Sequence, residues 1–275
     1  MFGIMQGRLV APEGPLYQCF PRDGWGSEFP RAKAAGLDAI EFIYDVYGAD
    51  VNPLGTAAGL DRMRALSAEH GIAVRSVCAD YFMDRPFVRC TESELRERVQ
   101  TLTWLLGQCA QLGMQRVVLP FVDASKLSTP EEITSLVKTL TAMIPVAKET
   151  RVELHLETDL DPQGFAALLE RLPSDMVWVN YDSGNSSGIG YKPREEFAAY
   201  GKRVGSVHIK DRVLGGTTVA LGTGSADFPA LFEALKSAGY DRDFILQAAR
   251  LELGGEVDLA RQNRAFAERF MKAAT

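Results

Sequence analysis

Three residues carry side chains that bind metal ions, and each stands at the end of a short apolar stretch typical of a buried strand. They are Glu157, Asp182 and His208. If these stretches are consecutive strands of one parallel sheet, their carboxyl ends meet and bring two carboxylates and one imidazole together. Oxygen and nitrogen donors without a thiolate suit manganese, magnesium, cobalt or zinc. Gln247, on a further strand, adds a neutral carbonyl oxygen, so we expect these four residues to form a divalent metal site.

Other polar residues follow the predicted strands and are expected to line the same site. His208 lies in the segment SVHIKDR, where three charged side chains follow it after one isoleucine. A purely structural strand end rarely concentrates charge in this way, although the cations could also form ordinary ion pairs with the carboxylates. Arginines would suit an anionic group of a ligand, such as a phosphate or a carboxylate. The residues that we predict to bind substrate are Arg8, Glu41, Asn185, Arg212 and Arg250.

Bringing these residues to one edge requires a regular alternation of strands and helices. Eight short segments rich in apolar residues predict strands, and their nearly continuous apolar character is typical of a parallel sheet covered on both faces. They span residues 2–5, 39–43, 73–77, 116–121, 152–156, 177–181, 205–209 and 244–247. Amphipathic segments predict helices at 60–70, 92–112, 130–149, 162–172, 195–202, 229–238 and 258–273. Capping-box patterns at Thr91 and Thr129 mark two helix starts.

This alternation predicts a (β/α)8 TIM barrel of the α/β class, as a single domain over residues 1–275. The repeat of roughly 34 residues is close to what each βα unit needs. An open doubly wound sheet would place a glycine-rich turn and a helix after the first strand, and the sequence lacks this turn. A later stretch, LGTGSADF at 221–228, lacks the GK[ST] of a nucleotide-binding loop. Its backbone N–H groups could hold a hydroxyl or phosphate, or it could be a tight structural turn.

The composition limits the expected partners and location. A net charge of −6 and a pI near 5.3 argue against binding nucleic acid, which needs a clustered basic surface. No segment approaches the roughly 18 consecutive apolar residues of a membrane span, and the start of the chain lacks the features of a signal peptide. We therefore expect a cytoplasmic protein that binds no membrane. The four cysteines form no CxxC pair and are expected to be buried thiols. A homo-oligomer is compatible with the sequence.

Motifs along nearly the whole chain carry a resemblance to a known superfamily. They are GIMQGRL at the start, AIEFI, HLET, NYDSGN and VHIKDR on the second, fifth, sixth and seventh predicted strands, and GTGSADF ahead of FILQAAR. In these motifs the chain resembles the sugar isomerase and epimerase superfamily of xylose-isomerase-like barrels, which also includes endonuclease-IV-like repair enzymes. The repair branch relies on several histidines and a basic surface for DNA, whereas this chain is acidic and has three histidines.

The resemblance implies a ligand set and a type of chemistry. Related sugar epimerases hold a divalent metal through Glu, Asp, His and Glu from strands five to eight, which fall on Glu157, Asp182, His208 and Gln247. In such enzymes the two glutamates exchange protons with the carbon beside a carbonyl, and the metal stabilises an enediolate. Gln247 keeps an oxygen for the metal but removes a proton acceptor, because an amide is not basic. We predict that Lys210 supplies the missing acid or base, with Asp211 and Glu41 as alternatives.

We therefore predict a metal-dependent isomerase or epimerase that acts on a small carbohydrate: a ketose, a sugar phosphate or a related polyol. Glu157 is expected to be both a metal ligand and the general base. Two alternatives stay open. One is a metal-dependent lyase that dehydrates a keto-sugar or keto-inositol, for which one base and one acid suffice. The other is a sugar-binding barrel that has lost catalysis, which the same Gln247 would also explain.

Overall fold

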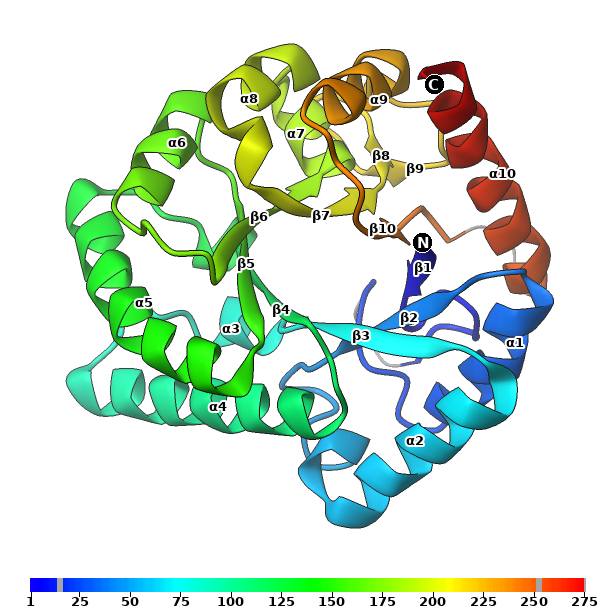
Figure 1. Cartoon of the computed structure of the whole chain (residues 1–275), viewed down its shortest axis with the longest axis horizontal. Helices are drawn as coiled ribbons and strands as arrows, with labels where there is room; N and C mark the ends of the chain where they lie inside the picture. The colour runs from blue at the N-terminus through cyan, green and yellow to red at the C-terminus, as the bar shows by residue number, and fades with distance from the viewer. Residues whose placement is uncertain (14–16, 251–253, 275) are drawn as a thin grey trace.

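The computed structural model, which describes residues 1–13, 17–250 and 254–274, shows a closed barrel of eight parallel strands (Figure 1). Around the barrel the strands follow the order β1, β10, β7, β6, β5, β4, β3 and β2. Their bounds are β1 Phe2–Met5, β2 Ala39–Ile43, β3 Ala73–Cys78, β4 Arg116–Phe121, β5 Glu153–Thr158, β6 Val177–Asp182, β7 Val204–Ile209 and β10 Phe244–Leu246. The predicted TIM barrel is confirmed, because every barrel strand coincides with a predicted one.

Helices form an outer ring around the barrel (Figure 1). Their bounds are α1 Glu28–Ala34, α2 Ala57–His70, α3 Tyr81–Asp84, α4 Glu92–Gln111, α5 Pro130–Thr150, α6 Pro162–Glu170, α7 Ser183–Ile189, α8 Pro193–Tyr200, α9 Phe228–Ser237 and α10 Glu256–Ala274. Short 3-10 helices span Trp25–Ser27, Pro53–Gly55, Asp123–Ser125 and Gly201–Arg203. An antiparallel hairpin, β8 Asp211–Arg212 and β9 Thr218–Val219, follows β7. The hairpin, α1, α3 and α7 were not predicted, because such short elements show too little periodicity.

Local signals fix several helix ends. Thr91 forms a complete capping box at the start of α4, since its Oγ1 accepts from Glu94 N at 3.3 Å and the Glu94 side chain accepts from Thr91 N at 2.8 Å. At the start of α5 the Thr129 side chain accepts a hydrogen bond from Glu132 N, as in a capping box. The Glu132 side chain, however, accepts from Ser128 N at 2.7 Å and not from Thr129 N. The second predicted capping box is therefore incomplete.

Buried apolar side chains of the strands and helices form one core cluster, and several polar side chains of the strands are buried as well. His208 on β7 and Glu41 on β2 come from strands that are not neighbours, yet their side chains are 2.7 Å apart. Such a contact is only formed across the barrel interior. The interior is therefore the place where the strands bring charged groups together.

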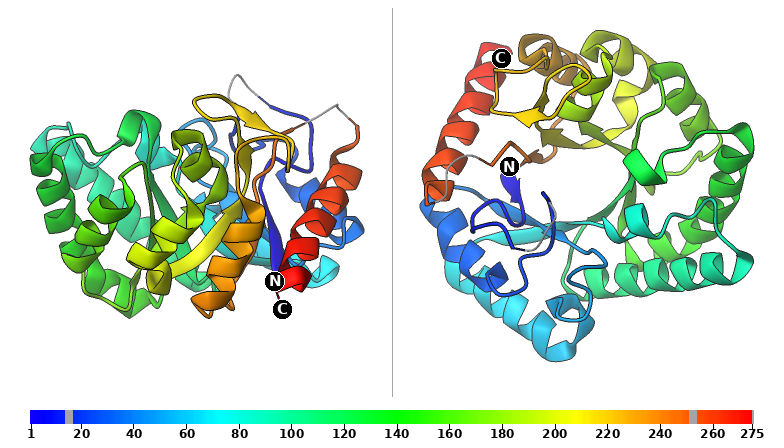
Figure 2. Two further views of the ribbon diagram at one scale, coloured as in Figure 1. Left: turned by 90° about the horizontal axis from the view of Figure 1, so that it is seen from above. Right: turned by 180° about the vertical axis from the view of Figure 1, so that it is seen from behind.

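The two ends of the barrel differ in what they carry. Both termini lie at one end, and the β8–β9 hairpin projects from the other, where the strands finish (Figure 2). Among the cysteines, Cys19, Cys78 and Cys109 are buried and Cys90 is half-buried, and all are free thiols. No helix in the described ranges is long and apolar enough to cross a membrane.

Candidate metal centre and substrate cavity

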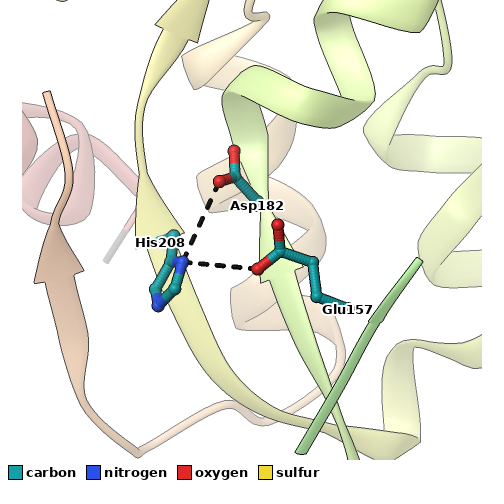
Figure 3. Close-up of side chains that lie close together, drawn as sticks. All are labelled: Glu157, Asp182 and His208. Carbon is teal, nitrogen blue, oxygen red and sulfur yellow. Dashed lines mark ion pairs between the residues drawn. The ribbon is translucent and has the colours of Figure 1, made fainter. Parts of the chain in front are cut away.

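Three consecutive strands bring the predicted metal ligands to one point near their carboxyl ends. Glu157 lies near the end of β5, Asp182 is the last residue of β6, and His208 lies on β7. One ligand atom from each lies within 4.8 Å of the others. His208 Nδ1 is 3.5 Å from Glu157 Oε2 and 3.8 Å from Asp182 Oδ2 (Figure 3). All three residues are buried, so their charges interact strongly.

Glu41 orients the imidazole of His208. Its Oε1 is 2.7 Å from His208 Nε2, and neither side chain is exposed. A carboxylate accepts, so Nε2 carries the hydrogen and Nδ1 faces the other two carboxylates. Burial lowers the pKa of His208, but the carboxylates of Glu41, Asp182 and Glu157 outweigh it and raise that pKa to about 10. The charges that favour a proton on Nδ1 would equally favour a metal cation there.

Glu157 is held by two amides. Asn180 Nδ2 donates to its Oε2 at 2.7 Å, and Asn185 Nδ2 donates to its Oε1 at 2.6 Å. Burial and the nearby charge of Asp182 raise the pKa of Glu157 to about 7. A carboxylate that titrates near neutral pH can both take up and release a proton, which suits a general base.

The two oxygens of Asp182 have different roles. Its Oδ1 caps α7 by accepting from Gly184 N and Asn185 N, each at 2.8 Å. The other oxygen, Oδ2, faces His208 and lies 3.3 Å from Lys210 Nζ. Burial raises the pKa of Asp182, but Lys210 and His208 outweigh it and lower that pKa to about 2, so the group stays ionised. The cap explains why the polar segment after β6 is helical.

The donor set fits a divalent cation. Two carboxylates and a neutral imidazole carry a charge of about −2, which balances a divalent ion, and the absence of a thiolate agrees with a harder metal. Glu41 behind His208 is the kind of outer carboxylate that metal-binding histidines use. The three side chains that converge therefore offer the donor atoms expected for a divalent cation, and their role as ligands stays a prediction.

A line of hydrogen bonds continues from this site down the barrel interior. Asn180 Oδ1 accepts from Ser206 Oγ at 2.6 Å, and that hydroxyl is 2.7 Å from His155 Nδ1. His155 Nε2 is in turn 2.9 Å from Glu153 Oε2, which accepts from Arg242 at 2.7 Å. Asn180 was not among the predicted site residues, and its signal in the sequence is a polar side chain two positions before Asp182 on an apolar strand.

A cavity of about 690 Å³ opens at the carboxyl end of the barrel, and Glu157 is the one of the three ligands that lines it, whereas Asp182 and His208 are not part of its described lining. Residues predicted as ligands or substrate contacts line it: Arg8, Glu157, Asn185, Lys210, Arg212 and Gln247. Lys210 Nζ and Arg212 Nη1 donate to Asn185 Oδ1 at 3.0 and 3.1 Å. A larger groove of about 950 Å³ lies over α8, α9 and α10 on the outer surface, and its lining includes no strand residue.

Neighbouring side chains orient Gln247. Gln18 Nε2 donates to Asp80 Oδ2 at 2.7 Å, and its Oε1 accepts from Gln247 Nε2 at 3.0 Å. The other end of the Gln247 amide, Oε1, is buried and has no hydrogen-bond partner within the described ranges. This oxygen is therefore available to a cation or to a substrate hydroxyl. Gln18 lies in a long loop, and nothing in the sequence marks it as part of the site.

Some residues predicted for the site lie elsewhere. Glu41 is beneath His208 and does not line the cavity. Arg250 also lies outside the cavity, and its Nη1 donates to Val10 O at 3.0 Å. Asp211, the alternative acid or base, has no exposed surface and accepts three backbone N–H groups. The contacts of these residues support the fold around the site.

The chain belongs to the xylose isomerase-like TIM barrel family, whose model matches residues 29–269. Among solved structures, an L-ribulose 3-epimerase superposes with a TM-score of 0.76 at 21% identity, covering 99% of this chain and 95% of that one. An IOLI protein with a bound zinc atom gives 0.75 at 19% identity, covering 99% and 97%. A xylose isomerase-like barrel from Mycobacterium smegmatis with magnesium gives 0.72 at 15% identity, covering 98% and 96%. No curated protein matches the chain by sequence.

Proposed function

We propose that the protein is a metal-dependent isomerase or epimerase that moves a proton on the carbon beside the carbonyl of a ketose or related polyol. The observation that carries this proposal is the convergence of Glu157, Asp182 and His208, of which Glu157 lines a cavity of about 690 Å³. A cavity of this size can enclose a small sugar. The similar L-ribulose 3-epimerase fold supports the same class of reaction.

The three converging residues would hold the metal, with Gln247 Oε1 as a further oxygen donor. Manganese, magnesium, cobalt and zinc all suit this donor set. When bound, the cation would supply Lewis-acid stabilisation of the negative charge that develops on the substrate oxygens. Glu41 would keep His208 in the orientation that presents Nδ1 to the site.

Glu157 is the group that we assign to proton abstraction. Burial and the nearby Asp182 raise the pKa of Glu157 above the ordinary value of a carboxyl group, which makes its carboxylate a stronger base toward a C–H proton. The amides of Asn180 and Asn185 fix the plane of its carboxylate.

Lys210 is the group that we assign to the second proton transfer, because Gln247 cannot act as an acid or base. Its ammonium lines the cavity and is held by Asp182 and Asn185 at 3.3 and 3.0 Å. If Lys210 returns a proton to the same carbon, on the face opposite Glu157, the result is epimerisation. If the proton is returned to the former carbonyl carbon, the result is isomerisation. Arg8, Asn185 and Arg212 would bind substrate oxygens.

The test is metal stoichiometry together with hydrogen exchange. Protein stripped and reloaded should hold one divalent ion per chain, and a substrate ketose in D2O should gain deuterium beside its carbonyl by proton NMR. Asp182→Asn keeps an oxygen to cap α7 but removes a charge. This variant should bind the metal more weakly and exchange deuterium more slowly. Asp161→Asn, at the equivalent cap of α6, is the matched control and should change neither. A wild-type protein that binds no stoichiometric metal contradicts the proposal.

A metal-dependent lyase is the second candidate, and Gln247 is the observation that favours it. Loss of water from a keto-sugar needs one base and one acid, which Glu157 and Lys210 provide without a second carboxylate. The same NMR experiment separates the two reactions. An unsaturated product supports the lyase, whereas deuterium in an intact carbon skeleton supports the isomerase.

A further inference from the structure

The side-chain amide of Gln18 can take only one orientation, because its two neighbours have opposite hydrogen-bonding chemistry. Arg8 Nη2 is 2.9 Å from Gln18 Oε1, and a guanidinium group can only donate. Asp80 Oδ2 is 2.7 Å from Gln18 Nε2, and a carboxylate can only accept. Turning the amide over would bring two donors together at Arg8 and two acceptors together at Asp80. The oxygen of Gln18 therefore faces Arg8, and its nitrogen faces Asp80.

The orientation of Gln18 determines that of Gln247. The Oε1 atom of Gln18 that accepts from Arg8 also accepts from Gln247 Nε2 at 3.0 Å, so both of its lone pairs are in use. The backbone of Gln247 is held as well, since its N donates to Ile209 O at 3.0 Å. Gln247 must turn its side-chain nitrogen toward Gln18. Its Oε1 is then left buried, with no partner among the residues that the structure describes.

The two neighbours of Gln18 are themselves anchored. Arg8 is buried, and its Nε donates to Ala248 O at 3.1 Å. The second oxygen of Asp80, Oδ1, accepts from Cys78 Sγ at 3.2 Å. Gln18 is therefore held between two fixed groups, and it cannot turn to suit a different partner without breaking one of these contacts.

A glutamate at position 247 does not fit this arrangement. A carboxylate oxygen in the place of Gln247 Nε2 would lie 3.0 Å from Gln18 Oε1, and neither oxygen has a hydrogen to share. Two buried acceptors in contact repel each other, and each also loses a hydrogen bond. The opposite atom of the wild-type amide, the unpartnered Oε1, needs a partner of its own, because buried polar atoms in folded proteins are rarely left unsatisfied.

We infer that Gln18 is a positioning residue that requires an amide at position 247 and aims Gln247 Oε1 at the bound ligand. Gln247 is then a working part of the site, and not the remnant of a glutamate in a barrel that has lost catalysis. The orientation of the two amides follows from hydrogen-bonding chemistry. The group that meets Oε1, a cation or a substrate hydroxyl, rests on the proposed function.

The first test is a double-mutant cycle on the protein in excess chelator, with the unfolding equilibrium constant measured in urea. Gln247→Glu should destabilise the wild type. The same substitution should cost roughly tenfold less in the unfolding constant when Gln18→Met has removed the facing oxygen. Gln163→Met, at an exposed position on α6, is the matched background and should leave the cost of Gln247→Glu unchanged. Equal costs in all three backgrounds contradict the inference.

The second test asks whether the aimed oxygen acts on a ligand. Gln18→Met should weaken Mn²⁺ binding in calorimetry, or raise the KM for the better exchanged of D-fructose and D-ribulose, by roughly 10- to 100-fold. The kcat for deuterium exchange should stay the same, because Glu157 and Lys210 are untouched. Gln163→Met should change none of these values. A loss confined to kcat, or no loss at all, overturns the inference.

Two further results separate this inference from the proposed function. A Gln247→Glu protein that exchanges deuterium faster than the wild type would show that a glutamate has been lost, and this also overturns the inference. If the wild type neither binds Mn²⁺ nor exchanges deuterium, the proposed function fails. The double-mutant cycle still decides whether Gln18 requires an amide at position 247, because it uses neither metal nor substrate.

Discussion

Replacing Glu28 by glutamine should remove a pH-dependent loss of stability. Glu28 lies at the start of α1 with no exposed surface, and its Oε1 accepts from Gly7 N at 2.7 Å and from Leu9 N at 3.3 Å. Its Oε2 has no hydrogen-bond partner within the described residues. Burial raises the pKa of Glu28 to about 8, so the carboxyl group is protonated at neutral pH. Glutamine has the same shape and is neutral at every pH.

The magnitude follows from the linkage between protonation and folding. The unfolded chain releases this proton at the ordinary pKa of 4.5, whereas the folded chain holds it until about 8. The folded state therefore binds more protons between these values, and the free energy of unfolding falls as pH rises. Each pH unit in this window costs about 1.4 kcal/mol, so from pH 5 to pH 7 the wild type loses about 2.7 kcal/mol through this group.

The assay is urea unfolding of the wild type and Glu28→Gln at pH 5 and pH 7. The stability of the variant relative to the wild type should be about 2.7 kcal/mol greater at pH 7 than at pH 5. Comparing the variant with the wild type removes the contributions of the other titrating groups to stability. Comparing pH 7 with pH 5 removes any constant cost of the buried amide. Glu97→Gln, at an exposed position on α4, should show no such change. If the free energy of unfolding of Glu28→Gln changes between pH 5 and pH 7 by as much as that of the wild type, Glu28 is ionised in the folded protein. That result would refute the reasoning.

Further predictions concern the metal centre. Glu41→Gln should weaken metal binding by roughly 10- to 100-fold in calorimetry, because His208 loses the carboxylate that orients it; unchanged affinity would contradict this role. Lys210→Gln should lower the rate of deuterium exchange by roughly 10²- to 10⁴-fold with the metal content retained, and an equal rate would exclude Lys210 as the second acid or base. Asn180→Leu should lower metal affinity, because Glu157 loses a donor, and Asn180→Asp should restore part of it by adding charge.

The sequence predicted the barrel and the metal ligands for the same physical reason. Buried parallel strands are apolar along their length, so polar residues at their ends stand out, and the fold then brings those ends together. Glu157, Asp182 and His208 were found in this way and do converge. The roles of these residues in a reaction stay a prediction, whereas the barrel and the family are confirmed.

The contacts behind the ligands could not be predicted, because they depend on which side chains meet across the barrel. Glu41 lies where the pairing of β2 with β3 shifts by one residue, and this irregularity is not visible in the sequence. Gln18 reaches the cavity from a loop without regular structure. Asp211 looked like a strand-end acid, but a tight turn folds over it. In each case the path of a loop or the register of a strand decides the role.

The hydrogen-bond line from Arg242 to Asn180 has a consequence for engineering and for evolution. In TIM barrels the amino end is usually the half that tolerates stabilising changes, and the carboxyl end is where activity is selected. Here Glu153, His155 and Ser206 belong to both halves, because each bond in the line sets the orientation of the next. Libraries that vary the amino end to raise stability would therefore also change activity at the carboxyl end. These positions are better held constant in such libraries.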